Sequence, residues 1–343
     1  MINYSSNVSL KDFTTMKLGG RAKFMINLKS LSQLDQIFEW VNRESIDFLM
    51  IGGGSNIIWL DEGFNGLLIV NQLSGFEVEN HQNDWIIKVG AGEIWDKIVA
   101  KTVLLGLSGI EALSLIPGKT GGTIMQNVGA YGQEIQDSLI DVEVFDTVTK
   151  KYQTLNRDQC LLDYRSSLFK NYQPRRYLIL SLRLRLSKNH FKYHPYEALN
   201  HYFNDHKIVP EDSNTIRQAV MDIRQTKLPD PNKIANCGSF FANPIVSQEQ
   251  FNNLNLDIKN KVPHWIFDHK IKLSAAWLIE YSGLKDFHDQ QTGFATWFKQ
   301  PLIVINEHGK TTKDLIKFKD LIVNQVFQKT KIRLSMEPEF LPN

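Results

Sequence analysis

Cysteine is scarce in this chain, with two residues among 343. Cys160 and Cys237 lie far apart, form no Cys-x-x-Cys motif and have no histidine at zinc-ligand spacing. The histidine pairs His201/His206 and His264/His269 are five residues apart, off the shared face that a helical metal site needs. These absences argue against a disulfide framework and a metal site. They favour a reducing compartment, the cytoplasm.

Long apolar runs and an excess of one charge are also missing. No run approaches the roughly 18 residues of a membrane helix, and residues 1–12 lack the apolar core of a signal peptide. Lys and Arg number 39 against 37 Asp and Glu, a net charge of +2 that gives no reason to expect a nucleic-acid partner. We expect a cytoplasmic protein without membrane or nucleic-acid partners.

Helix and strand patterns are mixed along the chain. The apolar spacing predicts helices at residues 31–42, 94–105, 215–227, 273–281 and 312–327. It predicts strands at residues 48–51, 67–70, 85–89, 142–145, 178–185 and 302–305. Polar stretches at 188–194 and 204–214 are predicted linkers. Without regular strand–helix–strand alternation, the pattern favours an α+β fold.

Two glycine-rich segments are candidates for a cofactor site. Residues 52–56, Gly-Gly-Gly-Ser-Asn, follow a strand and suit either a flexible turn or a pyrophosphate loop. Residues 116–132 hold five glycines between Thr, Gln and Asn, a composition that favours a ligand-binding loop. Gly90-Ala91-Gly92 lacks the third glycine of a dinucleotide fingerprint, because Trp95 stands there. Gly118-Lys119-Thr120 lacks the first glycine of a P-loop, because Leu113 stands there.

Five segments together resemble the UDP-N-acetylenolpyruvoylglucosamine reductase family. They are residues 52–56, residues 116–132, Tyr164-Arg165-Ser166-Ser167-Leu168-Phe169, the stretch from Lys227-Leu228-Pro229-Asp230-Pro231 to Gly238-Ser239-Phe240-Phe241-Ala242-Asn243-Pro244, and Glu337-Pro338-Glu339. The resemblance spans essentially the whole chain. It implies a two-part FAD-binding module of the vanillyl-alcohol-oxidase type plus a C-terminal α+β substrate domain.

The resemblance also implies domain limits, cofactors and a reaction. Residues 1–74 and 75–214, with the tail 329–343, would hold non-covalent FAD, and residues 215–328 would bind substrate. NADPH would donate hydride, and UDP-N-acetylglucosamine enolpyruvate would be reduced to UDP-N-acetylmuramate for peptidoglycan. The implied FAD-binding residues are Gly52, Gly53, Gly54, Ser55, Asn56, Ile116, Pro117, Gly118, Gly121, Gly122, Gln126, Asn127, Gly129 and Ala130.

Carried over by residue, the resemblance implies Ser239 as proton donor, with Arg165 and Glu339 as catalytic partners. A guanidinium can hold the negative charge of an enolate intermediate. A serine hydroxyl is a weak acid that can protonate a strongly basic carbon when it is well positioned. Taken without the motif, Ser239 would be a turn residue beside Gly238. Glu337 is the alternative to Glu339.

The implied substrate-binding residues are Tyr131, Tyr196, Arg224, Lys227, Asn243, Lys285 and Gln300. Lysines suit a diphosphate, although a single lysine is usually a solvated surface charge. The chain departs from the family pattern at Lys119 and Ile124-Met125, and it ends with Phe340-Leu341-Pro342-Asn343. Two other hypotheses remain, a flavin oxidase of the same fold and a non-catalytic flavin or nucleotide-sugar binding protein.

Overall fold

The structure is a computed structural model that describes residues 2–81, 84–188, 191 and 193–342. The chain divides into two compact units. The first unit comprises residues 1–8, 22–53 and 65–226, and the second comprises residues 9–21, 54–64 and 227–343. Part of the expected linker at 188–194 lies outside the described residues.

A four-stranded sheet and one helix form the first layer of the first unit. The strand order is β1 (Ser5–Ser9), β2 (Arg21–Leu28), β5 (Phe64–Asn71), β3 (Phe48–Ile51), and β3 runs parallel to β5. Helix α1 (Gln33–Glu44) buries Leu34, Ile37, Phe38 and Val41, the same-face spacing of an amphipathic helix, against sheet residues such as Ile26 and Leu67.

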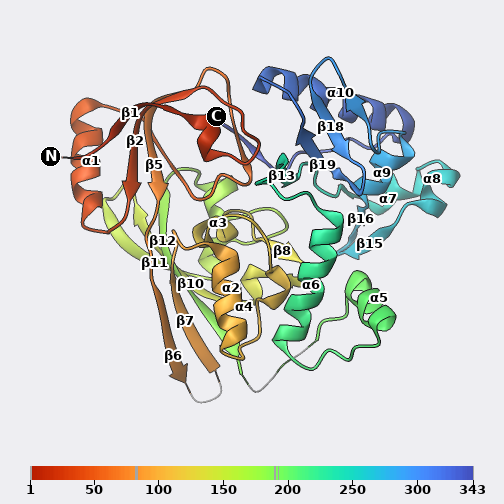
Figure 1. Cartoon of the computed structure of the whole chain (residues 1–343), viewed down its shortest axis with the longest axis horizontal. Coiled ribbons are helices and arrows are strands. Elements are labelled where there is room, and N and C mark those ends of the chain that lie inside the picture. Colours follow the sequence, from red (N-terminus) through yellow and green to blue (C-terminus); the bar gives the residue numbers. More distant parts are fainter. Residues whose placement is uncertain (1, 82–83, 189–190, 192, 343) are drawn as a thin grey trace. The chain divides into compact units, whose positions relative to one another are not determined.

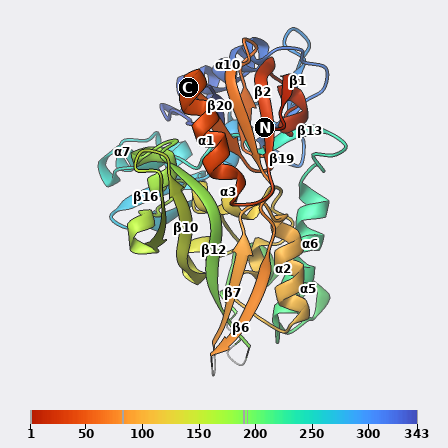
Figure 2. The ribbon, with the colours of Figure 1, turned by 90° about the vertical axis from the view of Figure 1, so that its left-hand side faces the viewer.

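A five-stranded antiparallel sheet forms the larger layer of the first unit (Figure 2). Its order is β11 (Lys151–Asn156), β10 (Leu139–Asp146), β12 (Tyr177–Ser187), β7 (Asp84–Gly90), β6 (Phe76–His81). Apolar residues of β7, β10 and β12 pack against helix α2 (Trp95–Leu104), whose Trp95, Ile98 and Val99 are buried. This core supports the loops that follow α2.

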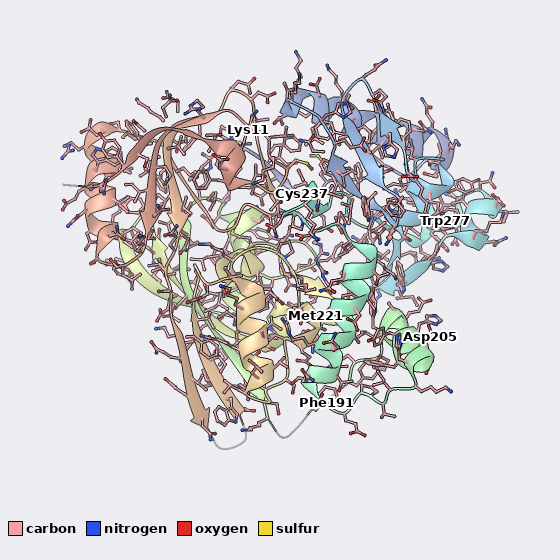
Figure 3. All side chains as sticks on the ribbon, viewed as in Figure 1. Lys11, Phe191, Asp205, Met221, Cys237 and Trp277 are labelled. Atoms are coloured by element: carbon pink, nitrogen blue, oxygen red, sulfur yellow. The ribbon has the colours of Figure 1, made fainter. Side chains whose placement is uncertain are left out.

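Shorter elements lie between the strands of the five-stranded sheet along the chain. They are η2 (Glu111–Leu113), α3 (Thr120–Met125), β8 (Gly129–Ala130), β9 (Gln133–Glu134), α4 (Ile135–Ser138), η3 (Asp158–Cys160) and the π-helix η4 (Leu168–Tyr172). Helices α5 (Glu197–His206) and α6 (Ser213–Lys227) follow. Leu199 and Phe203 of α5 pack against Ile216, Ala219 and Val220 of α6. Figure 3 labels Met221 on α6 and Asp205 on α5.

The second unit has its own sheets and core. Its four-stranded sheet has the order β13 (Ala235–Ser239), β19 (Gln300–Asn306), β18 (Phe294–Trp297), β17 (His288–Asp289), and its three-stranded sheet the order β14 (Ile245–Val246), β16 (Lys270–Leu273), β15 (His264–Phe267). A parallel pair joins β4 (Ile57–Trp59) and β20 (Glu339–Leu341). The remaining elements are η1 (Leu10–Phe13), α7 (Gln248–Asn252), α8 (Leu256–Lys261), α9 (Ala275–Tyr281) and α10 (Thr312–Thr330). Figure 1 shows α9 and α10 beside β18 and β19, and their shared core includes Leu278, Phe294 and Phe318.

The predicted α+β class is confirmed, because helices and mostly antiparallel sheets occur in both units. The strand predicted at 48–51 is β3, and the helices predicted at 94–105 and 215–227 correspond to α2 and α6. The linker predicted at 204–214 begins too early, because α5 continues to His206, where Phe203 packs against α6. The three-part domain division stays a prediction.

Candidate functional site

Gly52 and Gly53 of the first glycine-rich segment meet the second segment within the first unit. A Cβ built on Gly53 would lie 2.8 Å from the Gly118 Cα, a distance that two backbones reach only when neither carries a side chain there. A Cβ on Gly52 would lie 3.4 Å from the Lys119 Cβ. Because the segments touch through bare backbone, they form a narrow cradle.

The second segment also leaves open space above its backbone. A Cβ on Gly121 would lie 2.9 Å from that of Ala91, whereas one on Gly122 would meet no described atom within 4 Å. Close packing on one side and an open glycine on the other leave the loop backbone accessible to a ligand. This cradle fits the phosphates of a dinucleotide such as FAD.

Other predicted cofactor residues hold the loop in shape. Asn127 is buried and donates through Nδ2 to Glu134 Oε2 at 2.7 Å, and Gln126 Oε1 accepts from Lys170 Nζ at 3.3 Å. Gly129 and Ala130 form β8, and Ile116, Pro117 and Gly118 precede α3. Gly54, Ser55 and Asn56 belong to the second unit.

Lys119 interrupts this cradle with a long side chain. Its Nζ donates to the Asn71 carbonyl at 2.7 Å. Burial lowers the pKa of Lys119, and the nearby Glu93 carboxylate opposes that change. A lysine fits at this position because its stem passes beside Gly52 and its ammonium group donates to a backbone carbonyl.

Arg165 lies in a strained turn of the first unit. Its φ is 55°, in the left-handed region that costs a non-glycine residue about 1 to 2 kcal/mol. Asp163 and Ser166 close the turn through backbone hydrogen bonds of 3.2 and 3.1 Å. The next residue, Ser167, donates to the Met125 carbonyl at 2.6 Å and so ties the turn to the glycine-rich loop.

Tyr131, Tyr196 and Arg224 come together in the first unit. The Tyr131 and Tyr196 rings meet edge to face, with centroids 5.6 Å apart. Arg224 hydrogen-bonds to Tyr131, and its buried Nε has no hydrogen-bond partner among the described residues. Burial lowers the pKa of Arg224 and raises that of Tyr131. A buried donor without a partner suits an anionic ligand.

Ser239 and Glu339 lie on neighbouring segments of the second unit. Ser239 ends β13, and Phe240 and Phe241 after it are fully buried. The Glu337 N–H donates to the Phe240 carbonyl at 3.0 Å, and the Glu339 N–H donates to the Asn56 carbonyl at 3.1 Å. Glu337 is buried and Glu339 is half-buried, so Glu339 is the more accessible acid.

The remaining predicted substrate residues also belong to the second unit. Asn243 caps α9 by accepting from the Ala275 N–H at 3.0 Å. Lys285 pairs with Glu280 at 2.8 Å, and Gln300 starts β19 with its buried Oε1 unpartnered among the described residues. The exposed Lys227 has a fixed backbone, because the Trp297 indole donates to its carbonyl at 3.0 Å.

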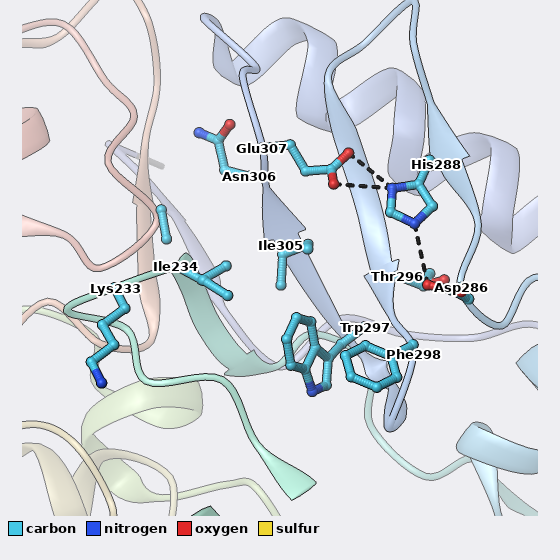
Figure 4. A pocket seen from close by; sticks show the side chains of 11 residues that line it. Lys233, Ile234, Asp286, His288, Thr296, Trp297, Phe298, Ile305, Asn306 and Glu307 are labelled. Carbon is cyan, nitrogen blue, oxygen red and sulfur yellow. Dashed lines mark hydrogen bonds and ion pairs between the residues drawn. The ribbon is translucent and has the colours of Figure 1, made fainter.

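An open pocket of about 530 Å³ lies beside this contact in the second unit (Figure 4). Trp297 and Phe298 line it, together with an ionic cluster in which His288 bridges Glu307 at 3.0 Å and Asp286 at 3.2 Å. Hydrogen bonds that the His288 ring donates to the Glu307 and Asp286 carboxylates raise the pKa of His288. No predicted site residue lines this pocket.

Three residues outside the predicted set hold the backbone at or just before predicted site residues. Trp297 donates to the Lys227 carbonyl. Asp96 accepts from the N–H of Leu115, the residue before the glycine-rich loop, and Arg217 pairs with Asp96. Each acts through a tertiary contact distant in sequence, so no local motif identifies it.

The described part of the chain offers neither a metal site nor a membrane-spanning helix. No group of three or more His, Cys, Asp or Glu residues there can hold a metal ion. No helix there is long and apolar enough to cross a membrane. Cys160 and Cys237 are free and buried.

Comparisons with known proteins agree with this cradle. The family model described as an FAD binding domain matches residues 22–150, and the model described as UDP-N-acetylenolpyruvoylglucosamine reductase, C-terminal domain, matches residues 230–341. A crystal structure of the reductase from Thermus caldophilus has the same fold, with a TM-score of 0.69 and 22% identity over 100% of both chains. The chain is an FAD-dependent oxidoreductase.

Curated relatives specify the family. The UDP-N-acetylenolpyruvoylglucosamine reductase of Cupriavidus pinatubonensis is 33% identical over 99% of this chain and 100% of its own length. The reductases of Escherichia coli O6:H1 and Amoebophilus asiaticus are 33% and 34% identical over 98% of this chain, and over 96% and 98% of their own lengths. The chain belongs to the UDP-N-acetylenolpyruvoylglucosamine reductase family.

Proposed function

We propose that this protein reduces UDP-N-acetylglucosamine enolpyruvate to UDP-N-acetylmuramate with NADPH, in the synthesis of peptidoglycan precursors. One observation carries the proposal: identity of 33 to 34% to reductases of this name extends over nearly the full length of both chains. Matched length matters because the cofactor-binding and substrate-binding parts are then both present.

The reaction needs a hydride, a proton and a place for negative charge. When bound, FAD would supply the hydride that NADPH donates, for delivery to the vinyl group of the substrate. The Arg165 guanidinium stabilises the charge that develops on the substrate carboxylate, because a fixed cation acts most strongly where charge appears during the reaction. Its closed turn fits this role, because a held backbone reduces the reorganisation needed on binding.

Ser239 donates the proton to the carbon that bears the ether oxygen. Its hydroxyl is a weak acid, so its position must supply what its pKa does not. The buried Phe240 and Phe241 give the segment a rigid apolar support. Glu339, on β20, orients or polarises the reacting group as the second acid.

The nucleotide sugar is bound by polar and cationic side chains. Lys227 and Lys285 contact its diphosphate, and Asn243 and Gln300 give hydrogen bonds. Tyr131, Tyr196 and Arg224 complete the set, supported by the Arg224 Nε that lacks a described partner. We place the reaction in the cytoplasm and assign the active form as a monomer. The two unpaired thiols agree with a reducing compartment.

Anaerobic stopped-flow absorbance tests this function. NADPH should bleach the oxidised flavin band, and the enolpyruvyl sugar added afterwards should restore it with one product formed per flavin. A flavin oxidase would not react with the sugar, and its flavin band would return rapidly only when oxygen is admitted. A non-catalytic binding protein would bind the sugar without either change in the flavin band. Either result would refute the proposed reaction.

A further inference from the structure

An ion pair outside the proposed catalytic set joins two helices of the first unit. Asp96 lies in the first turn of α2 and Arg217 on α6, and the two helices stand side by side (Figures 1 and 2). Arg217 Nη1 donates to Asp96 Oδ1 at 2.7 Å, and Nη2 donates to Oδ2 at 3.1 Å. The exposed fractions are 12% for the Arg217 side chain and 27% for that of Asp96. A two-pronged, partly buried pair fixes both position and angle.

The same carboxylate also holds the residue that leads into the glycine-rich loop. Asp96 Oδ1 accepts from the Leu115 N–H at 2.7 Å. Leu115 has a φ of 55°, in the left-handed region that disfavours a side chain, and Ile116-Pro117-Gly118 follow it. Such a conformation persists when its surroundings over-determine it.

The other side of the Leu115 peptide is held from α6. Arg224 Nη2 donates to the Leu115 carbonyl at 3.3 Å. Arg217 and Arg224 are seven residues apart, so both lie on one face of α6. Arg217 Nη1 also donates to the Oγ of the fully buried Ser114 at 2.8 Å. Residues 114 and 115 are therefore clamped between α2 and α6.

The negative charge of Asp96 lies close to the positive charges of Arg217 and Arg224. Burial acts to raise the pKa of Asp96, but hydrogen bonds from Arg217 and the Leu115 N–H outweigh it, so the pKa lies below its usual value. The carboxylate is thus charged at neutral pH. It attracts Arg224 as well as Arg217, and this attraction favours the charged form of Arg224 in its buried place.

We propose that Asp96, paired with Arg217, is a positioning residue that fixes the left-handed Leu115 at the entrance to the FAD loop and holds Arg224 for the substrate. The proposal has two parts. The first part, the effect on FAD binding, depends on the cofactor alone, whereas the second part, the effect on Arg224, rests on the proposed function. No reacting atom is assigned to Asp96.

Titration of the apoprotein with FAD, followed by flavin fluorescence, tests the first part, the effect on FAD binding. Asp96→Ala should raise the FAD Kd about tenfold, and Asp96→Asn should raise it less, because the amide oxygen can still accept from Leu115. Glycine adopts a positive φ without the side-chain penalty. Leu115→Gly in the Asp96→Ala background should therefore recover most of the FAD affinity, although Leu115→Gly alone changes it less than threefold.

Asp141→Ala is the matched control. It removes another two-pronged aspartate–arginine pair, Asp141 with Arg183, between β10 and β12. It should lower Tm while leaving the FAD Kd within twofold. If Asp96→Ala behaves like this control, or if Leu115→Gly fails to restore FAD binding, Asp96 is only a structural residue. Should Asp96→Ala not fold, the Asp96→Asn and Asp141→Asn variants make the same comparison.

Steady-state kinetics test the second part, the positioning of Arg224 for the substrate. Asp96→Ala reconstituted with saturating FAD should show a raised KM for the enolpyruvyl sugar, about tenfold, with kcat changed less, and Leu115→Gly should not correct it. An unchanged KM would remove Arg224 from the inference. If the normal protein does not turn over the sugar at all, the proposed function fails. The FAD titration still decides whether Asp96 positions Leu115 for FAD binding.

Discussion

The proton donor is the residue on which the proposed chemistry depends most. Ser239 has a hydroxyl whose free pKa is far from neutral, so it must act by position. Its segment is held by the Phe240 N–H, which donates to the Leu302 carbonyl at 2.8 Å, and by the Gly238 N–H, which donates to Asn236 Oδ1 at 2.9 Å. These contacts fix the backbone on both sides of Ser239.

Ser239→Ala separates the two halves of the reaction. NADPH should still bleach the flavin at close to the normal rate, because that half needs no proton on the substrate carbon. Return of the flavin band after the enolpyruvyl sugar is added should slow by roughly 10² to 10⁴. Stopped-flow absorbance measures both phases. Reoxidation at the normal rate would make Ser239 structural, and Glu339 would become the first candidate for proton donor.

Lys227 and Lys285 should each contribute separately to binding of the negatively charged substrate. Lys227→Ala and Lys285→Ala should each weaken binding of the nucleotide sugar by about 1.5 to 3 kcal/mol, as expected for hydrogen bonds to a charged group, while FAD binding is unchanged. Isothermal titration with both ligands makes the comparison.

Glu280→Gln is the control for Lys285. It breaks the exposed pair with Lys285 (2.8 Å) but keeps the lysine, and such pairs contribute at most about 1 kcal/mol. Sugar affinity should therefore stay near normal in this variant. If both lysine variants bind the sugar normally, the lysines are solvated surface charges.

At the scale of elements, the meeting of two glycine-rich turns makes the cradle. Gly53→Ala should separate them, because its Cβ would lie 2.8 Å from the Gly118 Cα, and both apoprotein stability and FAD affinity should fall.

Gly122→Ala should leave apoprotein stability unchanged, since its Cβ meets no described atom within 4 Å. It should still weaken FAD binding at least tenfold, because a ligand approaching the loop backbone would meet the new methyl group. Thermal melts and FAD titration check the pair, and normal FAD binding by Gly122→Ala would mean that FAD does not approach the loop there.

The turn between β10 and β11 should make stability depend on pH. Asp146 has a fully buried side chain and accepts from Arg176 Nη2 at 2.9 Å and from the Val148 N–H at 2.9 Å. The hydrogen bond from Arg176 is the main reason that the pKa of Asp146 lies well below its usual value. A lowered folded-state pKa stabilises the fold above the unfolded pKa of about 3.9, and this stabilisation is lost as the pH falls toward the folded pKa.

Asp146→Asn should therefore lower the free energy of unfolding by about 2 to 3 kcal/mol at pH 7, with the difference from the normal protein shrinking below about pH 4. Asp47→Asn is the control, because its pair with Arg175 is longer, at 3.4 Å, and its side chain is 60% exposed. It should change stability by less than about 0.5 kcal/mol. Urea unfolding from pH 3 to 8 measures both, and a pH-independent difference for Asp146→Asn would contradict the lowered pKa.

Across the whole molecule, the features that could be predicted from the sequence are those that leave a local pattern in it. Apolar periodicity located β3, α2 and α6, because burial of one face leaves a repeat in the residues themselves. The glycine segments could be recognised, and their contact at Gly53 and Gly118 supports the predicted cofactor loop. The parallel pairing of β4 with β20 could not be predicted, because it joins residues near 57 to residues near 340. The clamp of Asp96 on Leu115 was likewise invisible, since an aspartate in a first helical turn is ordinary.

The whole protein should carry one FAD per chain, held without a covalent bond. Attachment of the flavin through an imidazole or a thiol is not possible in either glycine-rich segment, because neither contains His or Cys. The two cysteines are poor nucleophiles, because burial raises the pKa of both Cys160 and Cys237 to about 12. Acid precipitation should therefore leave all of the flavin in the supernatant. Yellow colour in the washed pellet would contradict non-covalent binding.

Because FAD binds the folded chain and not the unfolded one, it should also stabilise the protein by mass action. Free FAD at 100 times its Kd should add about 2.7 kcal/mol to the free energy of unfolding, seen as a rise in Tm of several degrees for a chain of this length. Adenosine diphosphate at the same multiple of its own Kd is the control for ligand occupancy, and it should give the same free-energy gain. NADPH-free apoprotein that regains neither colour nor the higher Tm on adding FAD would contradict the assignment of the cradle, because the glycine contact would then exist without the ligand that it fits.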